Sequence, residues 1–92
     1  MANFIEKQIL ISNKLGLHAR AATKLAILSN QFQSEIHLQQ DEKSAPANSV
    51  MGLLMLESSQ GKYVTVSAKG DDAADALEAV ENLINNKFDE QE

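Results

Sequence analysis

Several residue types are scarce or missing from this 92-residue chain, which has no cysteine, no tryptophan, one proline and four glycines. The absence of cysteine excludes disulfides, thiolate chemistry and cysteine-ligated metal sites. So little proline and glycine, together with 43% hydrophobic residues, is typical of a globular chain and not of a disordered or fibrous one. A chain of this length has room for one hydrophobic core, so we expect a single domain over residues 1–92.

Positive charge is also scarce, with eight lysines and arginines against thirteen aspartates and glutamates and a net charge of −5. Because nucleic-acid binding needs clustered basic residues and these are scattered, the composition argues against a nucleic-acid partner. No apolar run approaches the roughly 20 residues of a membrane span, and Glu6 and Lys7 interrupt the region where a signal peptide would be apolar. We therefore expect a cytoplasmic protein, complete as written, that binds no membrane.

Patterns that would indicate a cofactor are missing as well. The sequence has no glycine-rich nucleotide loop, no catalytic pair of carboxylates and no cluster of metal-ligating residues. We therefore expect neither a metal nor another cofactor.

Alternating apolar and polar residues predict strands at residues 4–11, 34–40 and 62–68. Another short strand fits residues 43–47, where Pro46 indicates an edge position because proline donates no hydrogen bond to a neighbouring strand. The predicted inward-facing side chains of the three longer strands are Ile5, Ile9, Ile11, Ile36, Leu38, Val64, Val66 and Ala68.

Apolar residues at three- and four-residue spacing predict two longer helices, one over residues 19–30 and one that begins after Asp71 or Asp72. Ser49 is a good N-cap for a short helix of one or two turns, which Gly52 interrupts. The apolar positions of the last helix are Ala73, Ala76, Leu77, Val80, Leu83 and Ile84.

The predicted order is strand, helix, strand, strand, short helix, strand, helix, followed by a flexible acidic tail over about residues 88–92. This order favours an α+β fold. We expect an open-faced sandwich, in which a sheet of about four strands carries the helices on one face.

The stretch LGLHARAATKL, at residues 15–25, places His18 and Arg20 at the start of the first predicted helix. If that helix begins near Ala19, His18 is its N-cap, and the backbone N–H groups of Ala19, Arg20 and Ala21 have no partners within the helix. Such N–H groups and the positive end of the helix dipole bind anions, and they favour a neutral, nucleophilic imidazole. The stretch therefore suits phosphoryl transfer, although spacing alone also fits an ordinary surface histidine ahead of a helix.

The stretch GLHAR, at residues 16–20, resembles the active-site signature of the histidine-containing phosphocarriers of the bacterial phosphotransferase system, the HPr family. The stretch SVMGL, at residues 49–53, resembles the second motif of that family, which bears a serine. The likeness runs through nearly the whole chain in order and spacing. The segments NKLGLHAR, NSVMGLLML and NNKFDE are most similar to nitrogen-branch members of the family.

The resemblance implies a fold and a function. The fold would be a four-stranded antiparallel sheet with three helices on one side. His18 would take a phosphoryl group on Nδ1 from a phosphohistidine of an enzyme I and pass it to a histidine of an enzyme IIA-type protein, while Arg20 steadies the phosphate. The backbone N–H groups of Ala19, Arg20 and Ala21 would contact the phosphate. Such a protein is a phosphoryl carrier and not an independent enzyme, and we expect a monomer.

Two residues depart from the family pattern. Members usually carry proline where this chain has Ala21, so we expect a first helical turn that is looser by about 0.4–1 kcal/mol and a slightly more mobile His18. Leu15 stands where sugar-branch carriers tend to have asparagine, which favours the nitrogen branch. Asn13 is a nearby polar residue for which no motif match predicts a role.

Ser49 has a structural and a regulatory interpretation. As an N-cap it would accept a hydrogen bond from a free backbone N–H of the short helix. In some family members the matching serine is phosphorylated by a regulatory kinase, which would add about two negative charges beside the docking face.

The apolar stretch at residues 50–56 is longer than one buried face of a short helix can absorb. Apolar side chains exposed beside a reactive histidine suggest a docking patch, and methionines suit successive partners. By family correspondence the docking residues would be Leu17, Ala19, Val50, Met51 and Leu54, with Leu53 and Leu56 in the core.

Two other functions remain open at this point. A sugar-branch HPr would use the same chemistry with different partners. An HPr-like regulatory docking module would bind partners without turning phosphate over, and Ala21 is the feature that favours it. An independent hydrolase is poorly supported, because the sequence offers no base, orienting acid or substrate pocket.

Overall fold

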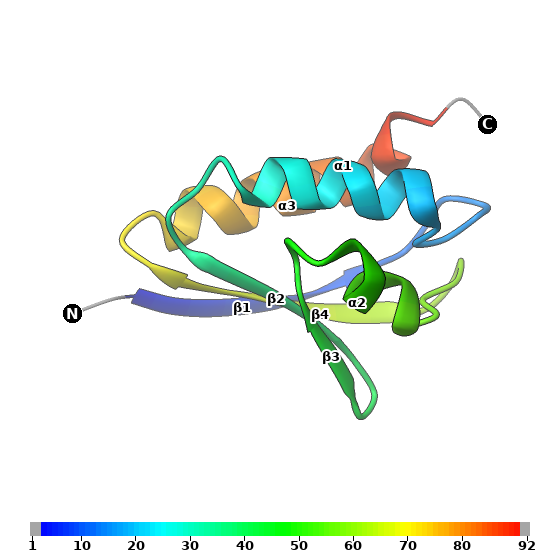
Figure 1. The fold of residues 1–92 in the computed structure, drawn as a ribbon, viewed down its shortest axis with the longest axis horizontal. Coiled ribbons are helices and arrows are strands. Elements are labelled where there is room, and N and C mark those ends of the chain that lie inside the picture. The colour runs from blue at the N-terminus through cyan, green and yellow to red at the C-terminus, as the bar shows by residue number, and fades with distance from the viewer. Residues whose placement is uncertain (1–2, 91–92) are drawn as a thin grey trace.

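The sheet has four antiparallel strands in the order β1-β4-β2-β3 (Figure 1). The structure is a computed structural model that describes residues 3–90. Its elements are β1 (Asn3–Leu10), α1 (Ala19–Ser29), β2 (Glu35–Gln40), β3 (Lys43–Pro46), α2 (Val50–Met55), β4 (Tyr63–Gly70), α3 (Ala73–Asn85) and the 3₁₀ turn η1 (Lys87–Asp89). The predicted order of elements is confirmed.

The strand register explains why one face of the sheet is apolar. Ile9 of β1 lies opposite Val64 of β4, and Leu38 of β2 lies opposite Val66 of β4. All four side chains are buried, because the alternation of each strand is in phase with that of its neighbour. β3 lies at the edge of the sheet and ends at Pro46, which confirms the predicted short edge strand.

The three helices lie on the apolar face of the sheet (Figure 1). α1 and α3 run side by side over the strands, and α2 packs against α1 and β3. The predicted open-faced sandwich is therefore confirmed. The helical side chains buried against the sheet are Ala21, Ala22, Leu25 and Ala26 of α1, Leu53 of α2, and Ala73, Ala76, Leu77, Val80 and Ile84 of α3.

The start of α3 differs in one respect from the prediction that an aspartate caps it. Asp72 occupies the N-cap position, but its side chain makes no cap hydrogen bond. Its carboxylate instead accepts hydrogen bonds from the backbone N–H groups of Gln33 and Ser34, each at 2.9 Å, and from the hydroxyl of Ser34. The Ser34 hydroxyl above all, followed by the Gln33 N–H, lowers the pKa of Asp72 below its usual range. Asp72 therefore joins the start of α3 to the residues ahead of β2.

Acidification is expected to weaken this junction. Because the pKa of Asp72 is lower in the folded than in the unfolded chain, its carboxylate stabilises the fold above the unfolded value of about 3.9. That contribution is lost as the pH falls through the folded value. We expect Asp72→Asn to lower the free energy of unfolding at about pH 7 and to lower it less at about pH 2, as urea unfolding would measure. The exposed Asp71→Asn is the control, and a deficit that does not change with pH would contradict this account.

Candidate functional site

The loop between β1 and α1 is pressed against the loop between α2 and β4. Gly16 has a φ of +64°, in the left-handed region that glycine favours. A Cβ at Gly16 would clash with the carbonyl oxygen of Ser58 and would lie 2.8 Å from Cα of Ser59. The backbone N–H of Leu17 donates to that same Ser58 oxygen at 2.8 Å. This backbone-to-backbone approach fixes the point from which α1 begins.

His18 is the N-cap of α1, as predicted. Its backbone is extended, with φ −87° and ψ −179°, and its carbonyl oxygen accepts the first helical hydrogen bond from Ala22 at 2.8 Å. Its side chain makes no cap hydrogen bond, so the imidazole is not used to begin the helix. The N–H groups of Ala19, Arg20 and Ala21 lie in the first turn, where helix geometry leaves them without partners inside the helix.

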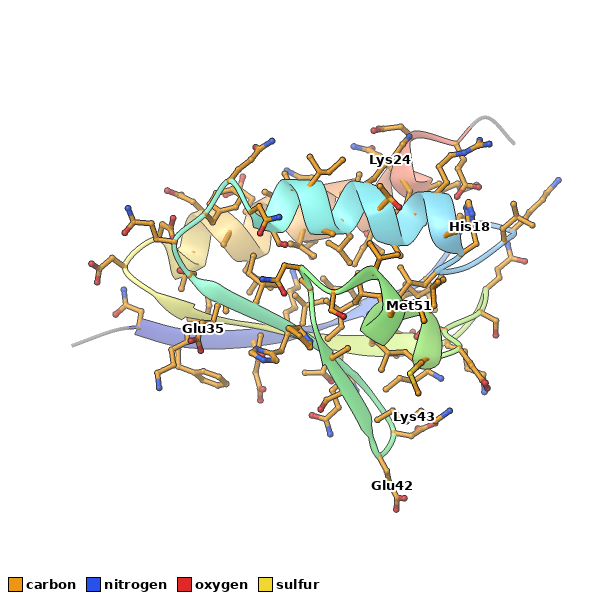
Figure 2. All side chains as sticks on the ribbon, viewed as in Figure 1. His18, Lys24, Glu35, Glu42, Lys43 and Met51 are labelled. Atoms are coloured by element: carbon orange, nitrogen blue, oxygen red, sulfur yellow. The ribbon has the colours of Figure 1, made fainter. Side chains whose placement is uncertain are left out.

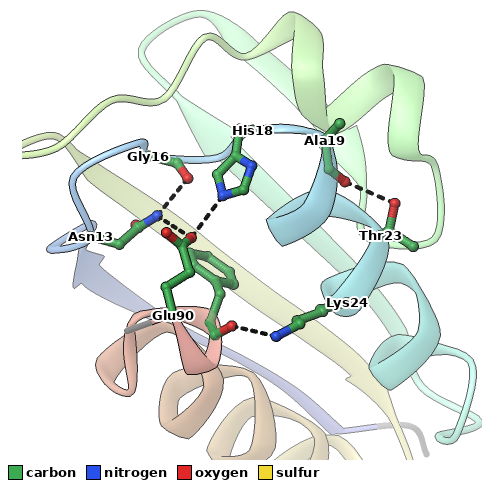
Figure 3. Close-up of polar contacts among 8 residues, drawn as sticks. Asn13, Gly16, His18, Ala19, Thr23, Lys24 and Glu90 are labelled. Atoms are coloured by element: carbon green, nitrogen blue, oxygen red, sulfur yellow. Dashed lines mark hydrogen bonds and ion pairs between the residues drawn. The ribbon is translucent and has the colours of Figure 1, made fainter. Parts of the chain in front are cut away.

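The imidazole of His18 meets a carboxylate from the other end of the chain (Figure 3). His18 Nε2 and Glu90 Oε1 lie 2.7 Å apart, and the same Oε1 accepts a hydrogen bond from the side-chain amide of Asn13 at 2.9 Å. That amide also donates to the carbonyl oxygen of Gly16 at 2.7 Å. Asn13 is fully buried, while the side chains of His18 and Glu90 are 25% and 11% exposed. These contacts form one network around the ring.

The frayed tail predicted from about residue 88 is wrong for residues 88–90. Phe88 is fully buried and belongs to the hydrophobic core. Its carbonyl oxygen accepts a hydrogen bond from Nζ of Lys24 at 2.8 Å, which links the tail to α1 (Figure 3). Burial of a phenylalanine side chain stabilises a fold by roughly 1.5–3 kcal/mol, which offsets the tendency of a short acidic segment to fray. Residues 91 and 92 lie outside the described part of the chain.

Glu90 carries a negative charge that its surroundings stabilise. The hydrogen bond from His18 is the largest of several influences that lower the pKa of Glu90 below its usual range. Partial burial opposes this shift, while the amide of Asn13 and the charges of His18 and Arg20 add to it. Arg20 is exposed, and it lines a shallow hollow together with Leu15, Lys24, Asp89 and Glu90. The surface next to His18 thus combines the basic side chains of Arg20 and Lys24 with two carboxylates.

The predicted docking residues differ in exposure. Met51 is 71% exposed and Ala19 is exposed, and Val50 and Leu54 are half-buried. Leu17 is only 4% exposed, so its side chain offers little surface to a partner, and its docking role stays a prediction without support from its exposure. Its backbone is bound to the loop ahead of β4, which turns its side chain into the core.

The rest of α2 follows the expected division between core and surface. Leu53 and Leu56 are buried, as predicted, whereas Met55 is 69% exposed and joins Met51 as a surface methionine. α2 packs against α1, and Figure 2 shows Met51 at the same end of the molecule as His18. The exposed side chain of Met51 therefore provides apolar surface at the same end of the molecule as His18.

Ser49 is the N-cap of α2, as predicted. Its hydroxyl oxygen accepts a hydrogen bond from the backbone N–H of Gly52 at 3.0 Å. This contact accounts for the serine structurally, and its phosphorylation stays a prediction.

A comparison with protein families identifies the family of the chain. The family described as "PTS HPr component phosphorylation site" matches residues 5–86. The chain belongs to the HPr family. The phosphocarrier protein NPr of Shewanella violacea is 58% identical over 86 residues, which cover 94% of each chain.

Solved HPr structures share the fold. The HPr of Thermoanaerobacter tengcongensis superposes with a TM-score of 0.90 at 42% identity, covering 96% of this chain and 99% of that one. A chain from an HPr dimer of the same organism gives a TM-score of 0.75 at 44% identity, covering 89% and 94%. The resemblance to HPr is thus confirmed, and the chain is an HPr-type phosphocarrier. The match supports the phosphocarrier interpretation over the docking module.

Within residues 3–90 of this HPr-family chain, no three histidine, cysteine, aspartate or glutamate side chains gather closely enough to hold a metal ion. No helix in the same range is long and apolar enough to cross a membrane.

Sequence reasoning missed Glu90, Phe88 and Asn13 as parts of the site. Phe88 offered a signal, because it is a large apolar residue within an otherwise acidic ending. If Phe88 had been assigned to the core, the neighbouring carboxylates would have been predicted to lie against the folded domain. No comparable signal marked Asn13, whose partners are distant in sequence or belong to its own loop.

Replacing Gly16 is expected to disturb the start of α1. Gly16→Ala adds a methyl group where the Ser58 carbonyl lies and also imposes left-handed backbone strain, so we expect a loss of about 1–3 kcal/mol in the free energy of unfolding. Gly61→Ala is a matched control, because Gly61 has a φ of +90° but nothing within 4 Å of an added Cβ. Urea unfolding of both variants measures the difference. Equal losses would show that the contact with Ser58 is unimportant.

Proposed function

We propose that this HPr-family chain accepts a phosphoryl group on Nδ1 of His18 from the phosphohistidine of an enzyme I. It then passes the group to a histidine of an enzyme IIA-type protein. The observation that carries the proposal is the position of His18 at the N-terminus of α1, with its side chain free of any capping bond. A neutral imidazole at this position has a nucleophilic nitrogen beside a positive helix end.

The first turn of α1 would hold the transferred phosphate. The N–H groups of Ala19, Arg20 and Ala21 are donors without helical partners, and a phosphate at a helix N-terminus accepts such bonds. The exposed guanidinium of Arg20 adds charge-assisted hydrogen bonds. Transfer between two histidines is nearly symmetric in its chemistry, so positioning and charge stabilisation account for most of the catalysis.

The docking surface would surround His18 with residues from α1 and α2. Exposed Ala19 and Met51 and half-buried Val50 and Leu54 supply apolar area, with Met51 the largest contributor by exposure. A flexible methionine adapts to different partners, which suits a carrier that binds a donor and an acceptor in turn.

The carrier would work in the nitrogen branch as a cytoplasmic monomer that forms a single HPr-like domain and is not an enzyme in its own right. The likeness to an NPr phosphocarrier at 58% identity supports the nitrogen branch. Its donor would then be the enzyme I of that branch.

Phosphorylation by enzyme I tests the acceptor. With phosphoenolpyruvate and nitrogen-branch enzyme I, we expect the wild-type chain to gain one acid-labile phosphate and His18→Ala to gain none, because the variant lacks the nucleophile. His37→Ala is the control, since His37 is exposed on β2 away from this site. Intact-mass spectrometry measures the phosphate. A phosphate on His18→Ala, or none on the wild type, would contradict the proposal, and faster labelling by the sugar-branch enzyme I would assign the other branch.

The alanine in the first turn of α1 can be tested by restoring proline. We expect Ala21→Pro to raise the free energy of unfolding by about 0.4–1 kcal/mol, because proline restricts the unfolded chain and this N–H has no partner inside the helix. The variant also loses one of the three backbone N–H groups proposed to hold the phosphate, and the loss of one hydrogen bond, worth about 0.5–1.5 kcal/mol, changes the transfer rate by about tenfold or less. Denaturant unfolding and single-turnover phosphorylation measure the two quantities. A gain of orders of magnitude in rate would mean that Ala21 is a functional defect.

A further inference from the structure

We infer that Glu90 is a positioning residue for phosphoryl transfer, because its carboxylate accepts the Nε2 hydrogen of His18 and so leaves the lone pair on Nδ1. This inference rests on the proposed function, in which Nδ1 takes the phosphoryl group. It assigns a role to the acidic end of the chain.

The hydrogen bond between the two side chains determines the tautomer of the ring. An ionised carboxylate only accepts hydrogen bonds, and the 2.7 Å contact involves Nε2. A neutral His18 bound in this way therefore carries its hydrogen on Nε2. Its unprotonated, nucleophilic nitrogen is then Nδ1.

Asn13 holds the accepting oxygen of Glu90 from a second side. Its amide nitrogen donates to Glu90 Oε1 and to the carbonyl oxygen of Gly16, both of which are acceptors. Its Oδ1 is buried and has no hydrogen-bond partner among the described residues. Rotating the amide would place Oδ1 against those two acceptors, so only the observed orientation satisfies them. The carboxylate is thus fixed by a fully buried side chain.

The backbone ahead of Glu90 turns the chain back toward His18. Lys87, Phe88 and Asp89 have φ values of 57°, 55° and 61°. Consecutive left-handed residues other than glycine are uncommon, and they persist where the surrounding structure imposes them. Here the surroundings are the buried ring of Phe88 and the bond from Lys24 to its carbonyl oxygen. The carboxylate two residues beyond that anchor consequently reaches the imidazole.

The transfer step uses the carboxylate without moving a proton. The Nδ1 lone pair forms a bond to phosphorus as the bond from phosphorus to the donor's histidine nitrogen breaks, and that electron pair returns to the donor ring. The Nε2 hydrogen stays on His18, so its ring becomes a phosphorylated imidazolium with a positive charge. Glu90 stabilises that charge as it develops, in the way that a buried carboxylate supports a catalytic histidine.

Two measurements on Glu90→Met test the inference. Methionine is about as long as glutamate but has neither a charge nor an oxygen that accepts hydrogen bonds, so nothing at that position holds the hydrogen on Nε2. In ¹⁵N spectra of the neutral imidazole, above about pH 8, we expect the wild-type ring to be in the Nε2–H form and the variant to show an increased Nδ1–H population. In single-turnover phosphorylation by enzyme I, we expect the variant to be slower by about 10-fold to 100-fold, as for the loss of a hydrogen bond to a charged group.

The control is Glu35→Met, which makes the same substitution at an exposed residue that Figure 2 places at the opposite end of the molecule from His18. It is expected to keep the wild-type tautomer and a rate near that of the wild type. An unchanged tautomer, an unchanged rate or a faster rate in Glu90→Met would overturn the inference, the last because the carboxylate would then hinder the ring. The tautomer measurement needs no partner protein. If the wild type is not phosphorylated at all, the proposed function fails, whereas a phosphorylated wild type with an unaffected Glu90→Met rejects only the role of Glu90.

Discussion

The contact between Gly16 and the carbonyl oxygen of Ser58 is the constraint on which the site depends. At this contact the backbones of two loops meet with no side chain between them, and a hydrogen bond from the backbone N–H of Leu17 to the same oxygen holds the loops together. From this point α1 can begin only at the next residues, so His18 lies at its N-terminus and α2 lies alongside. His18 and the exposed apolar side chains of α2 are therefore positioned by a single close approach.

The features that could be predicted from sequence are local ones. The N-caps His18 and Ser49 follow from a few neighbouring residues, as does the alternation that buries one face of each strand. The edge position of β3 follows from one proline. In each case the physical cause lies within a single element or its adjoining turn, so an ordered pattern of residue types is enough to predict it.

The features that escaped prediction depend on partners far away in sequence. His18 and Glu90 are separated by 72 residues, and nothing near either one indicates the other. Asp72 looks like an ordinary cap, yet its carboxylate accepts hydrogen bonds from backbone N–H groups ahead of β2, because the fold brings that distant segment within hydrogen-bond distance. Leu17 adjoins His18 but faces the core, because the direction of a loop side chain depends on the loop's own anchoring.

The return of the C-terminal segment to His18 has a practical consequence for work with this protein. Material joined after Glu92 would start two residues beyond Glu90, whose carboxylate contacts the imidazole. Material joined ahead of β1 would emerge at the opposite end of the molecule, where Figure 1 places the N-terminus. An affinity tag, a fluorophore or a surface tether is therefore best attached at the N-terminus when the chemistry of the histidine is to be measured.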